Sequence, residues 1–327
     1  MTTHDLNGAV VVITGASSGI GRATALEFAR QGASLILASR DADALDEVAH
    51  ECQRCGTNAR PVVADVTQAQ ALTHLAQFAV DVAGRIDVWV NNAGTGALGA
   101  FDSIPIEAHE QVIQTDLLGY MRGAYAVLPH FKRQQSGILI NNISLGAWTP
   151  QPYAASYSAA KFGLKGFAES LRGELYRWPH IHVCNLYPAV MDTPGFRDGA
   201  NYTGRDVKPL PPIYDARRTA RAMVRLAKRP RHTTYVGSAA VLSRVATALM
   251  PGFSQSYARF VDSALGRADP DATSSGNLFS PPSGERRIDG GFRNASEESG
   301  TRRVAVAATV ATATLAGLYL YRRRQRH

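Results

Sequence analysis

The chain has 327 residues, more than the roughly 250 of a common single α/β domain, and this length predicts one domain with an appendage. Its formal net charge is +8, but six arginines lie in residues 302–326, and the other 29 lysines and arginines face 27 acidic residues. The body is therefore nearly neutral. This distribution argues against a nucleic-acid partner and favours an anionic membrane surface as the partner of the basic tail.

The first predicted element is a strand that runs into a glycine-rich turn. Residues 10–14 read Val-Val-Val-Ile-Thr, a short apolar run typical of a buried parallel strand. Gly15, Gly19 and Gly21 follow in a G-x-x-x-G-x-G pattern, and an amphipathic helical pattern comes next. Such a turn lets the backbone approach a pyrophosphate, which then sits at the helix N-terminus. The order strand, glycines, helix predicts a dinucleotide site.

The second predicted strand, residues 34–38, ends in Ser39 and Arg40. An acidic residue at such a strand end would bind the ribose 2′-hydroxyl of NAD, whereas an arginine accommodates the 2′-phosphate of NADP. Arg40 offers a planar fork of donors for that phosphate, and Asp41 falls just beyond the strand end. We therefore predict NADP(H) in preference to NAD(H); the alternative is that Arg40 is a solvated loop residue.

Further apolar runs predict strands that alternate with helical patterns along the chain, at residues 60–64, 86–90, 137–143, 181–187 and 233–237. This alternation predicts the α/β class: a Rossmann-type, doubly wound parallel sheet of about seven strands with helices on both faces. Cys52 and Cys55 form a C-x-x-C inside a helical pattern without a second pair. We interpret them as two small residues in a reduced compartment and predict no metal site.

Tyr157 and Lys161 lie four residues apart, and Ser144 lies thirteen residues before the tyrosine. On a helix, positions i and i+4 share one face, so the ammonium would sit beside the phenol. A neighbouring cation lowers the pKa of a tyrosine from its ordinary value of about 10, which lets the phenol exchange a proton with an alcohol. Taken alone, the pair could also be an ordinary tyrosine and lysine on a surface helix.

These motifs together resemble the short-chain dehydrogenase/reductase family over roughly residues 7–240. The resemblance rests on residues 14–21, Asp65 with Val66, residues 91–94, Ser144, Tyr157 with Lys161, and residues 188–193. It implies an oxidoreductase that moves a hydride between a nicotinamide and a carbonyl or secondary alcohol. The alternative is a membrane-anchored NADP-binding sensor or scaffold without turnover.

The resemblance also implies roles for individual residues. Tyr157 would be the catalytic acid/base, Lys161 would lower its pKa and hold the nicotinamide ribose, and Ser144 would orient the substrate oxygen. Together with Tyr157 and Lys161, the implied cofactor-binding residues are Gly15, Ser17, Ser18, Gly19, Ile20, Gly21, Arg40, Asp65, Val66, Asn92, Ala93, Gly94, Pro188, Val190 and Thr193.

Two positions depart from the family pattern. Asp116 stands where the family usually has an asparagine that helps to hold a water in a proton relay to the lysine. We keep Asp116 as a candidate relay residue, although a carboxylate changes the local charge. Pro188 is followed by Ala189 where the family has glycine, which is a modest change at the turn.

The substrate and assembly are predicted from aromatic residues and from the resemblance. Residues 192–215, with Phe196, Tyr202 and Tyr214, would form a mobile flap, and Trp148 and Tyr153 could line the opposite wall. The aromatic residues, together with a C-terminal membrane anchor predicted below, indicate a lipophilic small-molecule substrate. In the family, helices corresponding to residues 107–131 and 155–177 pair subunits, which implies a homodimer or homotetramer.

The C-terminal third predicts a domain end, a linker and an anchor. Residues 239–265 are apolar at helical spacing, which fits packing against the domain or a membrane-facing amphipathic helix. We place the end of the catalytic domain (residues 1–265) there. Residues 266–301 are rich in Gly, Ser, Pro and charge, and this composition predicts a disordered linker.

Residues 302–327 contain a stretch without charge, residues 304–321, between two groups of arginines. Its helical length of about 27 Å is close to the thickness of a bilayer core. We predict a transmembrane helix; a peripheral helix, a helix packed on the domain and a disordered segment are the alternatives. Both flanks are basic, so the orientation stays open, and a cytoplasmic catalytic domain is expected because the start of the chain leaves no room for a signal peptide.

Overall fold

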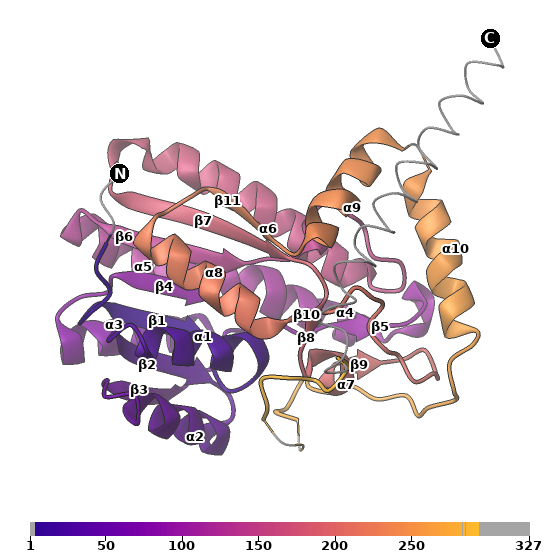
Figure 1. Ribbon diagram of the computed structural model, residues 1–327, viewed down its shortest axis with the longest axis horizontal. Coiled ribbons are helices and arrows are strands. Elements are labelled where there is room, and N and C mark those ends of the chain that lie inside the picture. The colour runs from indigo at the N-terminus through magenta and orange to yellow at the C-terminus, as the bar shows by residue number, and fades with distance from the viewer. Residues whose placement is uncertain (1–3, 251, 283, 285, 294–327) are drawn as a thin grey trace, which may run out of the picture.

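A computed structural model of the chain describes residues 4–250, 252–282, 284 and 286–293 (Figure 1). Its centre is a seven-stranded parallel sheet in the order β11-β7-β6-β4-β1-β2-β3. These strands are β1 (Val10–Thr14), β2 (Ser34–Ser39), β3 (Ala59–Val63), β4 (Val88–Asn91), β6 (Gly137–Asn142), β7 (Ile181–Pro188) and β11 (Thr233–Val236). The predicted doubly wound α/β sheet is confirmed, and each strand overlaps the apolar run that predicted it.

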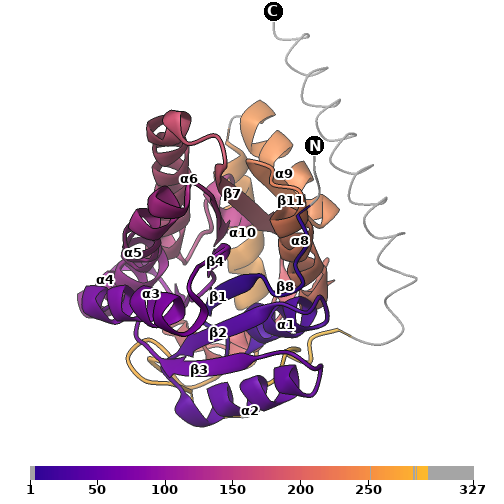
Figure 2. The same ribbon diagram turned by 90° about the vertical axis from the view of Figure 1, so that its left-hand side faces the viewer.

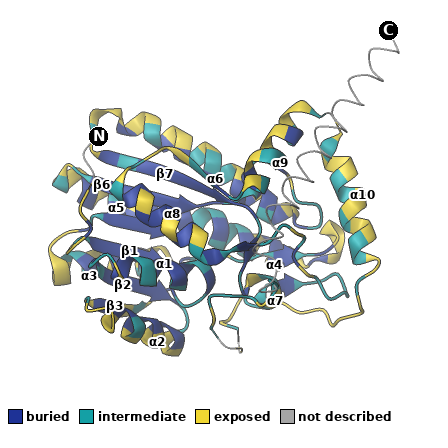
Figure 3. Cartoon of the chain, viewed as in Figure 1, coloured by how far each residue is buried: buried dark blue, intermediate teal, exposed yellow. Residues whose placement is uncertain are grey.

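Helices cover both faces of the sheet (Figure 2). One face carries α1 (Gly19–Ala29), α2 (Ala42–Gln53) and α8 (Ala216–Lys228). The other carries α3 (Ala69–Ala83), α5 (Gly119–Gln134) and α6 (Ala155–Glu174). Because side chains alternate along a strand, Val11 and Ile13 of β1 enter the first core and Val12 enters the second. The five inner strands are accordingly mostly apolar on both faces and buried (Figure 3), whereas most of the edge strand β3 is exposed.

The strand order reverses at β1, which lies between β2 and β4. Ligands of open parallel sheets bind outside the carboxyl ends of the strands at such a switch point. Smaller elements surround this edge: β5 (Ala97–Leu98) pairs with β9 (Ala200–Asn201), and β8 (Met191–Asp192) pairs with β10 (Tyr214–Asp215). The remaining helices are η1 (Phe101–Ser103), α4 (Ile106–Ile113), η2 (Gln114–Leu118), η3 (Leu145–Ala147), η4 (Leu175–Arg177), α7 (Gly195–Asp198), α9 (Ser238–Leu249) and α10 (Phe253–Leu265).

Residues 266–293 differ from the disordered linker that their composition predicts. Where the structure describes them, they run back beneath α7 and β9 toward the carboxyl edge of the sheet, in yellow in Figure 1. Ser274 forms an antiparallel bridge with Asn201, and Leu278 is fully buried in an apolar cluster with Val112 and Ala200. We call residues 277–293 the strap. These contacts hold the strap on the domain although it has few apolar side chains, the feature that made its composition typical of a linker.

The predicted anchor, residues 302–327, and the last part of the predicted linker lie outside the described residues. Within the described part of the chain, none of the helices combines the length and hydrophobicity that crossing a membrane requires. Helices α9 and α10 contact the loop after η3 through hydrogen bonds of Thr247 to Thr149 (3.0 Å) and of Tyr257 to Gln151 (3.0 Å). Leu249 and Phe260 on these helices are exposed, so part of their apolar surface faces away from the domain.

Candidate active site

The turn between β1 and α1 requires glycine at two positions. Gly15 has a φ of +64°, and a Cβ there would lie 2.7 Å from Cα of Ala93. A Cβ on Gly21 would collide with the carbonyl oxygen of Gly15. Both glycines therefore permit a close approach of backbone to backbone, and α1 begins at Gly19 with its N-terminus at the carboxyl edge of the sheet.

Asn92 fixes this turn against the central strands. Its Nδ2 donates to the carbonyl oxygens of Thr14 and Gly15, each at 3.1 Å, and its Oδ1 accepts from Nδ2 of Asn142 at 2.9 Å. These three bonds tie β1 and β6 to the end of β4. Asn92 therefore holds the glycine turn in place at the carboxyl ends of the central strands.

Lys161 and Asp116 form a buried ion pair. Lys161 Nζ lies 2.8 Å from Oδ2 of Asp116, and the two side chains are 3% and 0% exposed. Oδ1 of Asp116 accepts the N–H of Thr95 at 2.7 Å. Burial opposes the charged form of Lys161, but the adjacent carboxylate raises the pKa of Lys161 above its usual value. Burial also raises the pKa of Asp116, against the effect of the ammonium.

Asp116 lies in η2, a π-helical segment that follows α4. Such segments are often found at functional sites because they displace a side chain from the regular helical register. In this chain the side chain of Asp116 reaches Lys161 directly. The carboxylate thus contacts the lysine itself, and the role of Asp116 in a proton relay stays a prediction.

Tyr157, Lys161 and Ser144 are brought together by α6 and the loop before η3. Lys161 Nζ lies 5.3 Å from the ring centroid of Tyr157, as the i, i+4 spacing predicts. A Cβ on Gly146 would lie 3.2 Å from Cε1 of Tyr157 and 3.4 Å from Oγ of Ser144, so both side chains border one glycine. Ser144 Oγ accepts the N–H of Gly146 at 3.0 Å, which leaves its own proton available to a substrate oxygen. The arrangement can therefore hold an oxygen and exchange a proton with it.

A cleft of about 230 Å³ lies at the switch point, between the β1–α1 turn and the strap. The predicted cofactor-binding residues that line it are Gly15, Ser17, Ser18, Gly19, Ile20, Gly21, Arg40, Asp65, Val66, Asn92, Ala93, Gly94 and Thr193. Pro188 ends β7, and the carbonyl of Val190 accepts the N–H of Tyr214 at 2.8 Å. These two residues, and also Tyr157 and Lys161, are not among the residues that line the cleft. Lys161 is connected to the lining through Asp116, which accepts the N–H of Thr95.

Several lining residues were not predicted. They are Ser39, Asp41, Ala64, Thr95, Thr115, Asn142, Pro194, Gly195 and Asp198 from the domain and Asn277, Pro281, Pro282 and Arg286 from the strap. The domain residues neighbour predicted ones, so the ends of the predicted strands could have indicated them. The strap residues carry one signal in sequence, the adjacent Arg286 and Arg287 within a stretch rich in Gly, Ser and Pro.

The strap contacts the groups that a dinucleotide would use. The N–H of Gly19, at the start of α1, donates to the carbonyl oxygen of Arg287 at 2.9 Å. The guanidinium of Arg40 donates to the carbonyls of Leu278 (3.0 Å) and Asn277 (2.6 Å). Oxygen acceptors thus already sit on the helix N-terminus and on Arg40, which shows that both present donors into the cleft. The cleft is smaller than the roughly 300–1,000 Å³ of typical ligand sites, so a dinucleotide would require the strap to shift.

Trp148, which we predicted on a substrate wall, is not among the residues that line the cleft. Its ring packs 5.5 Å from that of Tyr187, and the guanidinium of Arg244 lies over it at 4.2 Å. Tyr153 donates its hydroxyl to Asp262 of α10 at 2.9 Å. Tyr202, by contrast, packs with Tyr157 against the cluster that contains Leu278. The apolar surface beside the candidate catalytic tyrosine therefore comes from residues 97–112, the flap and the strap.

The cysteines have no contact with this site. Burial raises the pKa of Cys52 to about 12, and Cys55 is exposed. Such a buried thiol is a poor nucleophile because the thiolate is the reactive form. Among the described residues, no group of three or more His, Cys, Asp or Glu could hold a metal ion.

Comparison with known proteins agrees with this geometry. A family profile described as short chain dehydrogenase matches residues 9–201. The uncharacterized oxidoreductase YxnA of Bacillus subtilis is 34% identical over 251 residues, which are 75% of this chain and 70% of that protein.

Two solved structures show the same fold. An alcohol dehydrogenase from Thermococcus sibiricus, complexed with 5-hydroxy-NADP, is 29% identical with a TM-score of 0.60, over 70% of this chain and 95% of its own. A short-chain dehydrogenase/reductase from Burkholderia phymatum, in complex with NAD, is 23% identical with a TM-score of 0.68, over 83% and 99%. The likeness to the Thermococcus enzyme supports a nicotinamide cofactor, and the Burkholderia structure, at 23% identity, supports the fold alone.

Proposed function

The chain belongs to the short-chain dehydrogenase family and is an oxidoreductase of that type, and from this premise we propose that it interconverts a carbonyl and a secondary alcohol with NADP(H). The observation that carries the proposal is the convergence of Tyr157, Lys161 and Ser144 next to a cleft lined by the glycine turn. A binding protein without turnover would not need this proton-transfer group. The similarity to oxidoreductases does not favour that alternative.

The chain's own groups account for the proton and for the position of the substrate. A bound nicotinamide would supply the hydride. Ser144 donates a hydrogen bond to the substrate oxygen, and Tyr157 gives that oxygen a proton in reduction or removes it in oxidation. The ammonium of Lys161 stabilises the phenolate that Tyr157 leaves behind, and Asp116 keeps this lysine charged in a buried position.

The preference for NADP(H) rests on Arg40. Its guanidinium lines the cleft at the end of β2, and a guanidinium fork suits a phosphate better than a hydroxyl. The two strap carbonyls fix the fork without using all of its five N–H donors. We include this preference in the proposal.

A lipophilic substrate and an oligomer are further parts of the proposal. Tyr157 packs against the cluster of Ala97, Ile104 and Leu278, which offers an apolar wall next to the reacting oxygen. On α5 and α6 the side chains of Tyr125 and Phe162 are exposed. These are the helices through which the family pairs subunits, so we propose a homodimer or homotetramer that covers them.

The test of the proposed function is a screen of the purified full chain against lipophilic ketones, aldehydes and secondary alcohols with NADPH and NADH. We expect oxidation of NADPH with at least one lipophilic carbonyl. Turnover of small polar carbonyls alone would contradict the lipophilic substrate. Binding of a dinucleotide without any turnover would favour the sensor alternative.

We also propose that residues 302–327 anchor the enzyme to a membrane and that the catalytic domain is cytoplasmic. Truncation after Gly300 removes the uncharged stretch and all six tail arginines. We expect the truncated chain to remain in the supernatant after sedimentation of membranes, whereas the full chain sediments and requires detergent for release. Release of the full chain from membranes by high salt without detergent would contradict an inserted helix. It would indicate an electrostatic contact or a contact with another protein.

A further inference from the structure

We propose that Arg286 of the strap is a specificity-determining residue of the dinucleotide site, because it neutralises Asp41 and adds a second guanidinium beside Arg40. This inference rests on the proposed function and names a residue that selects NADP(H) over NAD(H). Arg286 lines the cleft together with Arg40 and Asp41. It comes from a part of the chain that follows the last strand of the sheet by about fifty residues.

Without the strap, the charges of Arg40 and Asp41 at the end of β2 would not decide between NADP and NAD. An arginine there favours a 2′-phosphate, but a carboxylate beside it would repel a phosphate and could accept the 2′-hydroxyl of NAD. Arg40 and Asp41 alone sum to no net charge. A phosphate dianion would gain little from such a pair.

Arg286 removes this ambiguity. Its Nε and Nη2 lie 2.7 Å and 2.6 Å from Oδ2 of Asp41. Oδ1 of the same carboxylate accepts the N–H of Ala44 at 3.1 Å, where Asp41 caps α2. Both carboxylate oxygens are therefore engaged and the carboxylate is neutralised. The group of Arg40, Asp41 and Arg286 then carries one net positive charge.

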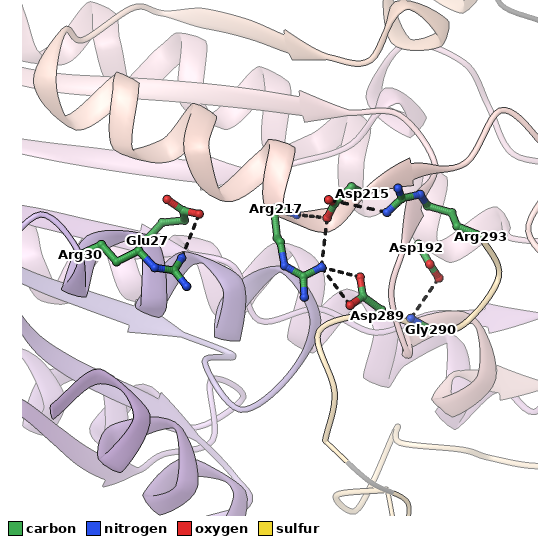
Figure 4. Close-up of polar contacts among 8 residues, drawn as sticks. All are labelled: Glu27, Arg30, Asp192, Asp215, Arg217, Asp289, Gly290 and Arg293. Atoms are coloured by element: carbon green, nitrogen blue, oxygen red, sulfur yellow. Dashed lines mark hydrogen bonds and ion pairs between the residues drawn. The ribbon is translucent and has the colours of Figure 1, made fainter. Parts of the chain in front are cut away.

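The strap holds Arg286 at this place from both sides. Before it, Leu278 is fully buried and Asn277 Oδ1 accepts the hydroxyl of Thr95 at 2.6 Å. After it, Asp289 contacts Arg217 at 2.8 Å and Asp192 accepts the N–H of Gly290 at 3.0 Å (Figure 4). The side chain of Arg286 is itself only 11% exposed. Arg286 thus belongs to the cleft wall in this structure, between two ends of the strap that contact the domain.

The hydrogen bond from the N–H of Gly19 to the carbonyl of Arg287 means that the strap also occupies part of the expected pyrophosphate site. A pyrophosphate that accepts the N–H of Gly19 has to displace the carbonyl of Arg287. If that competition were the main effect of the strap, loosening it would strengthen the binding of both dinucleotides. If Arg286 selects the phosphate, its loss weakens NADPH alone. Competition predicts tighter binding of NADPH when the strap is loosened, and selection by Arg286 predicts weaker binding. One set of variants therefore separates the two.

The experiment measures the dissociation constants of NADPH and NADH by calorimetry on the full chain, and those of 2′,5′-ADP and 5′-AMP as smaller probes. Arg286→Gln is expected to weaken NADPH and 2′,5′-ADP by about tenfold or more, because charge-assisted contacts to a phosphate are lost. NADH and 5′-AMP should change by less than about threefold. Arg286→Lys should retain most of the preference because it keeps the charge.

Two further variants separate charge from structure. Asp41→Asn in the Arg286→Gln background should restore part of the NADPH affinity, because asparagine still caps α2 but carries no charge. Asp289→Asn is the matched control: it also removes an arginine–aspartate contact between strap and domain, but one whose residues do not line the cleft. It should leave the ratio of the two affinities unchanged.

Equal weakening of both dinucleotides in Arg286→Gln, no change in either, or tighter binding of both would overturn the inference, and the last result would identify the strap as a competitor of the cofactor. A wild-type chain that binds neither dinucleotide would overturn the proposed function as well. Binding of both dinucleotides by the wild type with an unchanged ratio in Arg286→Gln would overturn this inference alone.

Discussion

Replacement of Tyr157 by phenylalanine is expected to lower kcat by roughly 10²–10⁴-fold, the usual contribution of general acid–base catalysis. The substitution removes the hydroxyl that exchanges the proton and keeps the ring that packs against the cluster of Ala97 and Leu278. The dissociation constant of NADPH and the midpoint of thermal unfolding should therefore stay close to those of the wild type. Steady-state reduction of a carbonyl found in the screen measures kcat, calorimetric titration measures the dissociation constant of NADPH, and a thermal unfolding scan measures the midpoint.

Tyr153→Phe is the matched control for this prediction. It removes a phenolic hydroxyl four residues earlier in the chain, one that is bonded to Asp262 of α10. Its kcat should remain within about threefold of the wild type, because this hydroxyl is committed to a contact outside the proton-transfer group. A Tyr157→Phe enzyme that retained more than about a tenth of the wild-type kcat would assign the proton transfer to another group.

Local sequence patterns predicted the parts of the site that depend on near neighbours. The strand of residues 10–14, the turn of Gly15 and Gly21, and the i, i+4 pair on α6 each have a period or spacing that the backbone geometry imposes. The doubly wound parallel sheet followed from the alternation of strands and helices, because parallel strands with helical crossovers have few possible arrangements. These features could therefore be predicted without knowledge of long-range contacts.

Contacts between distant segments could not be predicted in this way. Asp116 was recognised as a departure from the family pattern, but its direct contact with Lys161 joins η2 to α6, and no sequence pattern indicated that pairing. The strap was interpreted as a linker because it has few apolar residues. Many of its contacts use main-chain carbonyls, such as those that accept from Arg40, and every residue type carries that group. Arg286 and Asp41 are 245 residues apart, so only the fold could pair them.

The buried pair gives the largest expected effect on stability. Asp116→Leu should lower the free energy of unfolding by about 3–5 kcal/mol, because it leaves the ammonium of Lys161 buried without its carboxylate. Asp116→Asn keeps an acceptor for only one of the two donors, the N–H of Thr95 and the ammonium, so an intermediate loss of about 1–3 kcal/mol is expected. Urea unfolding of the cofactor-free protein measures each value.

The double variant Asp116→Leu with Lys161→Met tests whether the cost arises from an unpaired charge. Replacing both partners removes the buried ammonium, so the double variant should be more stable than Asp116→Leu alone, although it lacks two polar groups instead of one. A double variant less stable than the single one would mean that lost packing dominates. In that case Asp116 would act as a structural residue of η2, and the charge of Lys161 would have to be maintained by its surroundings, including the face of the Tyr120 ring at 5.0 Å.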